Sequence, residues 1–164
     1  MSGVAPTVGA IAVGLACLLL GKGYAEYVGG RLRDYESVYG FLELMHREIS
    51  CRLATPSELA AHSSDERLRE CGFLDMLADG ERLGVAFGSV AEKLLLSERD
   101  KAFLQSYFDG FGAGSPQSEL RALDITLREL ALRVRSVRED LPKRARLARV
   151  LLGLFALGII ILLL

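Results

Sequence analysis

Few side chains in this sequence have the type and spacing that chemistry requires. The two histidines, His46 and His62, stand outside any HExxH pattern, and neither has a second metal ligand at a familiar spacing. Adjacent carboxylates occur at Asp65–Glu66 and at Glu139–Asp140, where they are typical of solvated helix faces and helix starts. We therefore predict that these side chains are structural and that the chain holds no metal ion.

The glycines and cysteines also lack a reactive context. The run Gly110–Gly114 resembles a phosphate-binding loop, but it follows a predicted helix and no Gly-Lys-Ser/Thr comes after it. No serine lies in a GxSxG pattern. The cysteines Cys17, Cys51 and Cys71 form no CxxC pair, which fits a reducing cytosolic compartment rather than a disulfide framework. We predict a protein that is not an enzyme and that binds no cofactor.

The composition indicates one domain whose apolar residues are concentrated in a few segments. The 164 residues are 51% hydrophobic and yet 25% charged. A net charge of −1 and the absence of tryptophan argue against nucleic acid as a partner. Residues 22–118 have a net charge of −5 and residues 119–149 a net charge of +4, so the basic excess lies beside the C-terminal apolar segment.

The first apolar segment, Val4 to Leu20, has no charged residue. At about 1.5 Å per residue it reaches roughly 26 Å, near the lower limit for crossing a bilayer. No Lys or Arg precedes it, as a secretory signal peptide would require, and the first positive charge, Lys22, follows it. We predict a transmembrane segment at residues 1–21, with the N-terminus outside and the following domain in the cytoplasm.

The last apolar segment, Val150 to Leu164, follows a cluster of basic residues, namely Lys143, Arg144, Arg146 and Arg149. This order again places the preceding domain in the cytoplasm, and it predicts a second transmembrane segment at residues 147–164. The basic cluster could also bind anionic lipid or an acidic partner, but setting the topology is the simpler interpretation. The central domain is then residues 22–146, with both termini outside.

Within the central domain, apolar residues recur at helical spacing. Val28, Tyr35, Leu42 and Ile49 lie seven apart on one face of a helix predicted over Tyr24–Leu53. Capping boxes predict the starts of three further helices, at Thr55–Glu58, Ser63–Glu66 and Ser97–Asp100.

The second of these helices is expected to carry the apolar residues from Leu68 to Leu77, and the third is expected to end at Gly110–Gly114. In the stretch Gly80–Gly88 the glycines are four apart, and two interpretations stay open. The stretch is either a helix face that another backbone approaches closely, or a loop followed by a helix from Val85.

The last helix is predicted to start at Ser115–Pro116 and to carry a ladder of apolar residues at three- and four-residue steps: Leu120, Leu123, Leu127, Leu130, Val134, Val137 and Leu141. The simpler partner for this ladder is the helix Tyr24–Leu53 of the same molecule. Self-association of two chains through the ladder stays open. Pro142 is expected to weaken the helix where the domain meets the second span. The predicted fold is all-α: an antiparallel bundle of about five or six helices between two transmembrane helices.

Several features follow one another in an order that a known family shares. They are the apolar N-terminus, a long first helix ending at Arg47–Ile49, the Thr55-Pro56 helix start, the turn Leu96–Asp100, the helix ending near Gly112, the Leu-rich last helix and the closing segment Leu151–Leu164. In this order and over nearly its whole length, the chain resembles the stage III sporulation protein AB family.

The resemblance implies a component of the channel apparatus that links mother cell and forespore. The helical domain is similar to the cytoplasmic domains of platform proteins in type II secretion and type IV pilus machines. The implied partners are a secretion-type hexameric ATPase, other membrane proteins of the same complex and the lipid bilayer. The implied location is the mother-cell side of the outer forespore membrane. Two alternatives are a membrane-tethered enzyme, which needs a pocket with convergent polar groups, and a small pore-forming protein, which the large central domain disfavours.

Overall fold

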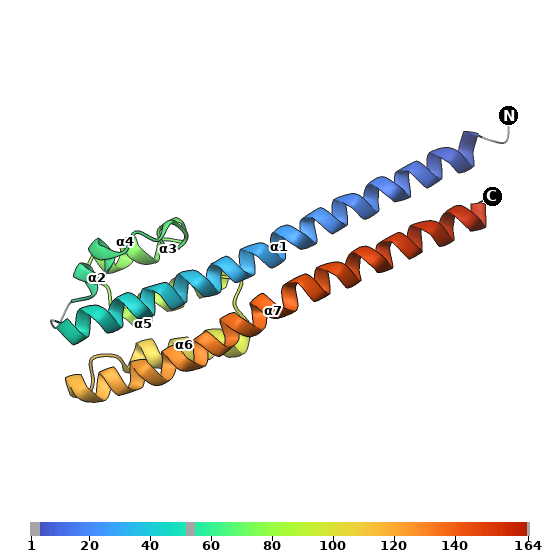
Figure 1. Cartoon of the computed structure of the whole chain (residues 1–164). Helices are drawn as coiled ribbons and strands as arrows, with labels where there is room; N and C mark the ends of the chain where they lie inside the picture. The colour runs from blue at the N-terminus through green and yellow to red at the C-terminus, as the bar shows by residue number, and fades with distance from the viewer. Residues whose placement is uncertain (1–3, 52–54, 164) are drawn as a thin grey trace. The chain divides into compact units, whose positions relative to one another are not determined.

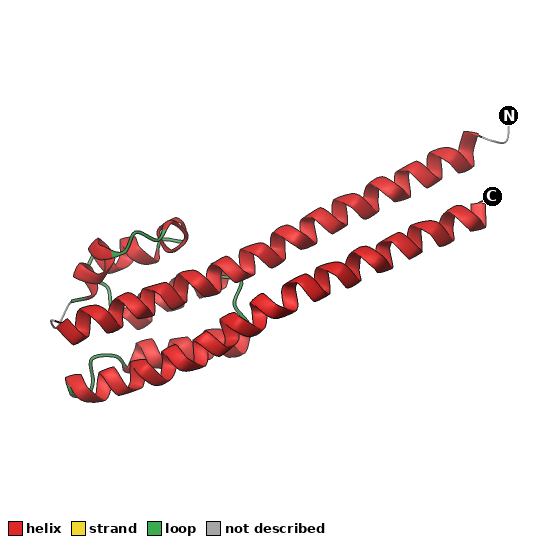
Figure 2. Cartoon of the chain, viewed as in Figure 1, coloured by secondary structure: helices red, strands yellow, loops and turns green. Residues whose placement is uncertain are grey.

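The computed structural model describes the backbone of residues 4–51 and 55–163. For residues 4–20, 25, 51, 141–149 and most of 151–163, the backbone alone is described. Every regular element in the described part is helical, which confirms the all-α prediction (Figure 2). The elements are α1 (Val4–Cys51), α2 (Pro56–His62), α3 (Glu66–Glu70), α4 (Phe73–Ala78), α5 (Leu83–Val90), the 3-10 helix η1 (Ala91–Lys93), α6 (Glu98–Gly110) and α7 (Pro116–Leu163) (Figure 1). The described residues form seven α-helices, more than the five or six expected, because Gly72 divides one predicted helix into α3 and α4.

The chain divides into two compact units. One contains residues 30–135, and the other contains residues 1–29 together with residues 136–164. Among the residues whose side chains the structure describes, no helix has an apolar stretch long enough to cross a membrane. The two predicted spans, residues 1–21 and 147–164, lie almost entirely outside those residues, as do the side chains of the basic cluster. The predicted domain boundaries therefore stay predictions.

Within the unit of residues 30–135, α1 buries the face that the seven-residue spacing predicts. Tyr35, Leu42 and Ile49 are all buried there, and Val38 and Met45 fill the intervening turns. Because residues seven apart return to nearly the same side of an α-helix, this stripe faces the interior over several turns. The remaining helices of the unit pack against it.

The short helices α2, α3 and α4 show how local residues set helix limits. Thr55 caps α2 as predicted: its backbone N–H donates to Glu58 Oε2 at 2.8 Å, and its hydroxyl accepts the Glu58 N–H at 3.4 Å. The predicted box at Ser63 is wrong, because Asp65 caps α3 by accepting the Leu68 N–H at 2.9 Å. Gly72 then takes a positive φ of 90°, which glycine adopts without strain, and so divides the helix expected through Leu77 into α3 and α4.

The glycine stretch combines both interpretations that the sequence left open. Gly80 has a positive φ of 89° and lies in the turn that follows α4. Helix α5 then begins at Leu83. Gly84 and Gly88 lie on one face of α5, against α6. A Cβ on Gly84 would lie 3.0 Å from Asp109 Cα, and one on Gly88 would lie 3.3 Å from Gln105 Oε1. The absence of a side chain at Gly84 and at Gly88 therefore allows α5 to approach α6 closely.

Helix α6 ends at Gly110 and α7 begins at Pro116, as predicted. Leu123 and Leu130 of the α7 ladder are fully buried, whereas Leu120, Leu127, Val134 and Val137 are half-buried and the Leu141 side chain is not described. The helix continues through Pro142, and the weakening expected there stays a prediction.

Two polar links show that α1 and α7 are antiparallel within the unit of residues 30–135. His46 of α1 pairs with Asp124 of α7. Tyr35, which precedes His46 in α1, is linked through Asp100 to Arg133, which follows Asp124 in α7. Helices α1 and α7 are therefore antiparallel neighbours in this unit, and packing of the ladder itself on α1 stays a prediction.

Four phenylalanines from four helices form the centre of the unit. Phe73 of α4 lies 5.1 Å from Phe41 of α1, 6.4 Å from Phe87 of α5 and 6.2 Å from Phe108 of α6, measured between ring centroids. Phe87 and Phe108 are 5.0 Å apart, and all four side chains are buried. Edge-on and tilted pairs of this kind are favourable beyond the area they bury.

Candidate functional site

The two histidines join helices. His46 Nε2 of α1 lies 3.0 Å from Asp124 Oδ1 of α7, and His62 Nδ1 of α2 lies 4.0 Å from Glu48 Oε2 of α1. Both histidine side chains are partly exposed, so each pair contributes little to stability by itself. Among the described residues, no group of three or more His, Cys, Asp or Glu side chains could hold a metal ion.

Cys71 is the one cysteine whose side chain the structure describes, and it is buried between α3 and α4. Burial raises the pKa of the Cys71 thiol, because the thiolate would lose its hydration there. The Sγ atom lies 3.3 Å from the Leu68 carbonyl oxygen, to which the thiol donates. A neutral, buried thiol is a poor nucleophile, so this residue serves packing.

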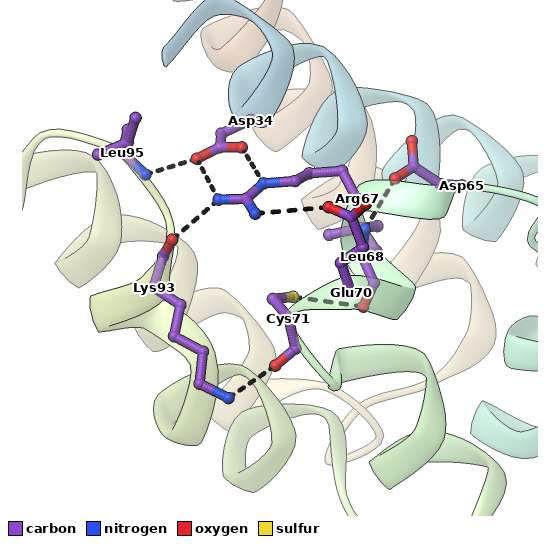
Figure 3. A network of polar contacts seen from close by, with 8 residues as sticks. All are labelled: Asp34, Asp65, Arg67, Leu68, Glu70, Cys71, Lys93 and Leu95. Carbon is purple, nitrogen blue, oxygen red and sulfur yellow. Dashed lines mark hydrogen bonds and ion pairs between the residues drawn. The ribbon is translucent and has the colours of Figure 1, made fainter. Parts of the chain in front are cut away.

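The most concentrated polar arrangement is the Asp34 cluster, formed by Asp34, Arg67, Lys93 and Leu95 (Figure 3). The Asp34 side chain is only 1% exposed. Its Oδ1 accepts from Arg67 Nε at 2.6 Å, and its Oδ2 accepts from Arg67 Nη2 at 3.3 Å and from the Leu95 backbone N–H at 2.7 Å. A buried carboxylate needs this number of donors, because it has given up its hydration.

Arg67 connects Asp34 to two other segments. Its Nη2 also donates to the Lys93 carbonyl oxygen at 3.0 Å, and its Nη1 lies 3.8 Å from Glu70 Oε2. The hydrogen bond to Asp34 is the largest influence on Arg67, and it raises the pKa of the guanidinium group. Lys93 then extends the chain of contacts, since its Nζ donates to the Cys71 carbonyl oxygen at 2.9 Å. One buried carboxylate thus joins α1, α3 and the segment after η1.

The Asp100 cluster begins at the next residue of α1. The Tyr35 hydroxyl donates to Asp100 Oδ2 and accepts the Ser97 N–H at 3.2 Å. Asp100 also forms an ion pair with Arg133 of α7 and accepts from Ser97 Oγ at 2.6 Å. The Ser97 hydroxyl caps α6 as predicted, by accepting the Asp100 N–H at 3.2 Å.

The other half of the predicted capping box at Ser97 is not formed. In such a box the acidic side chain accepts the backbone N–H of the cap residue. Here the Ser97 N–H goes to Tyr35, and the Asp100 carboxylate turns to Tyr35 and Arg133 instead. The Arg133 guanidinium group also lies 5.4 Å from the centre of the Phe103 ring, a cation–π distance. This cluster joins α1, α6 and α7.

These two clusters were not predicted, although the sequence contains a signal for one of them. Asp34, Val38, Phe41 and Met45 follow one another at four- and three-residue steps, and all four are buried. A carboxylate at a position that continues an apolar stripe must be paired if the helix packs. Its partner, Arg67, could not be found from spacing because the pair depends on tertiary structure.

The described surface has shallow hollows. One of about 440 Å³ lies where α6 turns into α7, and small residues such as Gly110, Ala113 and Ala122 line it together with Tyr107. The Tyr107 hydroxyl is buried and has no hydrogen-bond partner among the described residues. Burial, followed by the nearby Glu119 carboxylate, raises the pKa of Tyr107. The described residues that line this hollow include no hydrogen-bonded pair of a nucleophile and a base, so we interpret the hollow as a surface for packing.

Comparison with known proteins identifies the class of this all-helical chain. The family model described as stage III sporulation protein AB matches residues 7–164. The chain therefore belongs to the stage III sporulation protein AB family, as the sequence resemblance indicated, and it has a role in sporulation. No curated protein and no solved structure gives a match.

Proposed function

We propose that this chain is a non-enzymatic, membrane-anchored scaffold of the apparatus that links mother cell and forespore. The observation that supports the anchoring most directly is the extent of the two longest helices. Helix α1, of 48 residues, contains both the apolar segment Val4 to Leu20 and the buried face around Leu42. Helix α7, also of 48 residues, contains both the buried Leu123 and the apolar residues that follow Val150. Each apolar terminal segment thus continues by helix into the folded unit.

In this proposal, residues 1–21 and 147–164 cross the membrane and residues 22–146 lie in the cytoplasm. The basic cluster before the second span keeps that side in the cytoplasm and holds the span at the interface. With the family membership, this topology corresponds to the mother-cell side of the outer forespore membrane. Apolar residues in the spans would contact lipid in place of other protein segments.

The scaffold role is supported by how the polar side chains inside the folded unit are used. The Asp34 and Asp100 carboxylates bind arginines and backbone groups of neighbouring helices. These groups hold helices together, and Arg67 also lines an open surface hollow of about 280 Å³. The exposed surfaces then dock other proteins, namely a secretion-type hexameric ATPase and other membrane subunits of the same apparatus.

Topology is tested by reporter fusions in the full-length chain. A reporter that is active only outside the cytoplasm is placed after Leu164, and the same reporter is inserted at Gly80, in the turn after α4. We expect activity from the first fusion and none from the second. Activity at Gly80 or its absence after Leu164 would disprove the two-span arrangement, provided that immunoblots show both fusions intact.

Docking is tested by purifying the full-length chain in detergent and measuring its binding to the ATPase encoded with it. We expect a saturable complex that survives in the presence of nucleotide and that needs no catalytic activity of this chain. The same measurement with the other membrane subunits covers the remaining partners. Failure to bind any of them, in detergent and in sporulating cells, would disprove the scaffold proposal.

A further inference from the structure

Helix α7 has a second ordered set of side chains, on its outer side. Ile125 and Leu132 are seven residues apart and are 62% and 65% exposed, although both are large aliphatic residues. Three exposed arginines, Arg121, Arg128 and Arg135, also follow one another at steps of seven. We call these five residues the basic–apolar stripe, and all of them belong to the unit of residues 30–135.

Helix geometry places the stripe opposite the core. Seven residues of an α-helix are almost two full turns, so each set of residues stays on one side of α7. Leu123 and Leu130, which are fully buried, are two residues before Ile125 and Leu132 respectively, and two residues correspond to about 200° around the helix. The stripe is therefore directed away from the interior that the ladder fills.

Two arginines of the stripe, Arg121 and Arg128, differ from Arg133, which stabilises the fold. Arg133, only one residue from Leu132, forms the ion pair with Asp100. By contrast, Arg121 and Arg128 form no hydrogen bond or ion pair with any side chain in the described part of the chain. A guanidinium group binds carboxylates through two parallel hydrogen bonds, and it is less strongly hydrated than an ammonium group.

We propose that the basic–apolar stripe binds an amphipathic helix of a partner protein that carries acidic residues beside its apolar ones. The partner's apolar side chains pack on Ile125 and Leu132, and its carboxylates pair with Arg121 and Arg128. This arrangement repeats the logic of paired helices, in which apolar residues form the seam and flanking charges select the partner. The inference rests on the proposed scaffold function and specifies the surface and the partner chemistry.

Charge and composition favour this partner over two others. A second copy that used the same stripe would bring three arginines against three arginines, which is repulsive. A membrane surface is bound by helices with a broad, continuous apolar face. Here Ser118, Glu129 and Ser136 lie beside the two aliphatic residues, so the apolar strip is narrow. A narrow strip with a row of arginines along one side matches a single helix.

The surface is tested by photo-crosslinking in the full-length chain in sporulating cells. A photoreactive amino acid replaces Leu132, and in a control chain it replaces Val85, which is 51% exposed on α5 and lies outside the stripe. We expect the Leu132 position alone to give an adduct with an acidic helical segment of another protein, as mapped by mass spectrometry. An adduct with lipid or with a second copy of this chain, or no adduct at all, would overturn the proposal.

The charge requirement is tested on the subunit so identified. The double change Arg121→Glu and Arg128→Glu should weaken its binding to the full-length chain by about tenfold or more, because two attractions become repulsions. The matched control is Arg99→Glu, an exposed arginine on α6, which should change the affinity less than about twofold. Exchanging the facing acidic residues of the partner for arginine should then restore binding. Unchanged affinity in the double variant, or no rescue, would contradict the inference.

The two proposals fail in different ways. If the unaltered chain binds neither the ATPase nor any membrane subunit, the scaffold function is wrong. If it binds them and the double charge reversal has no effect, the scaffold function stands and the stripe is not the binding surface. Circular dichroism of each variant, with a melting temperature equal to that of the unaltered chain, shows that the substitutions leave the fold intact.

Discussion

The Asp34 carboxylate in α1 and the Arg67 guanidinium group in α3 are 33 residues apart in the chain and meet through two hydrogen bonds of 2.6 and 3.3 Å. Asp34 is almost completely buried, whereas the Arg67 side chain is 26% exposed. The arginine can therefore return to water if the pair breaks, but the carboxylate cannot. This asymmetry decides which substitution harms the fold more.

Replacing Arg67 with methionine should destabilise the protein by roughly 3–5 kcal/mol, because it leaves the Asp34 charge buried without its main partner. Among the donors that the structure describes, the Leu95 N–H alone would remain to bind that carboxylate. Urea unfolding of the full-length chain in detergent, followed by circular dichroism, measures the loss. Arg99→Met, on the exposed side of α6, is the control and should change stability by less than about 0.5 kcal/mol.

The double variant Asp34→Leu and Arg67→Met measures how strongly the effects of the two side chains on stability depend on one another. Removing both charges should cost less than the sum of the two single substitutions, because no buried charge is left over. Strict additivity would show that Asp34 and Arg67 do not depend on one another.

Tyr107→Phe should leave stability at neutral pH unchanged or slightly higher, since the buried hydroxyl has no hydrogen-bond partner among the described residues. Its effect should appear in alkali. The fold raises the pKa of Tyr107, mainly by burial, so the folded state favours the neutral phenol. That contribution is complete below pH about 10, the pKa of an unfolded tyrosine, and is lost as the pH rises further.

Unfolding free energies measured between pH 8 and 12 test this expectation for Tyr107. The unaltered chain should lose more stability across this range than Tyr107→Phe does. Burial of the Cys71 thiol also raises its pKa and adds a loss of the same sign, but that loss is common to both proteins. The control Tyr24→Phe alters an exposed tyrosine and should follow the unaltered chain. Parallel pH curves for all three proteins would refute the role of Tyr107.

Gly84→Ala should destabilise the fold by about 1–3 kcal/mol, a typical result of overpacking. The added Cβ would lie 3.0 Å from Asp109 Cα and collide with the Asp109 carboxylate, so α5 and α6 would have to separate. Gly40→Ala is the matched control, because Gly40 is also helical but has no atom within 4 Å of the added Cβ. It should instead stabilise the protein by roughly 0.5–1 kcal/mol through helix propensity. Thermal unfolding of the two variants should therefore shift in opposite directions.

Asp100→Ala should cost roughly 3–5 kcal/mol, because it removes the shared acceptor of Tyr35 and Arg133. Tyr35→Phe removes one donor and leaves the ion pair with Arg133, so about 1–2 kcal/mol is expected. Asp79→Ala, at an exposed aspartate after α4, provides the baseline and should be nearly neutral. Equal losses for Asp100→Ala and Asp79→Ala would show that the cluster contributes nothing to stability.

Local signals predicted much of this fold, because helix limits depend on neighbouring residues. Thr55 and Ser97 cap helices, Pro116 begins α7, and the seven-residue spacing of Tyr35 and Leu42 marks the buried face of α1. The prediction at Ser63 was wrong because a second residue able to cap a helix, Asp65, lies two positions later. Asp65 is chosen because α2 extends to His62 and takes Ser63 as its own C-terminal cap.

The partners within the Asp34 and Asp100 clusters could not be predicted from neighbouring residues in the sequence. Whether Asp34 faces water or Arg67 depends on where α3 lies, and no residue near either position encodes that distance. The same holds for Asp100, whose spacing from Ser97 predicted a capping box although the carboxylate serves Tyr35 and Arg133. Ile125 and Leu132 differ from the buried ladder residues in being exposed to solvent. That difference depends on how α7 packs, so it could be seen only in the structure.

The distance along the chain between Asp34 and its partners also has a consequence during synthesis. Asp34 leaves the ribosome before Arg67, which follows 33 residues later and therefore roughly 2–7 s later at translation rates of about 5–20 residues per second. Throughout that interval the Asp34 carboxylate stays hydrated. An aspartate near the middle of a membrane-spanning helix opposes insertion into lipid by about 2.5–3.5 kcal/mol. The residue that later joins three segments of the folded unit thus disfavours entry of this part of α1 into a lipid bilayer while the chain is still being made.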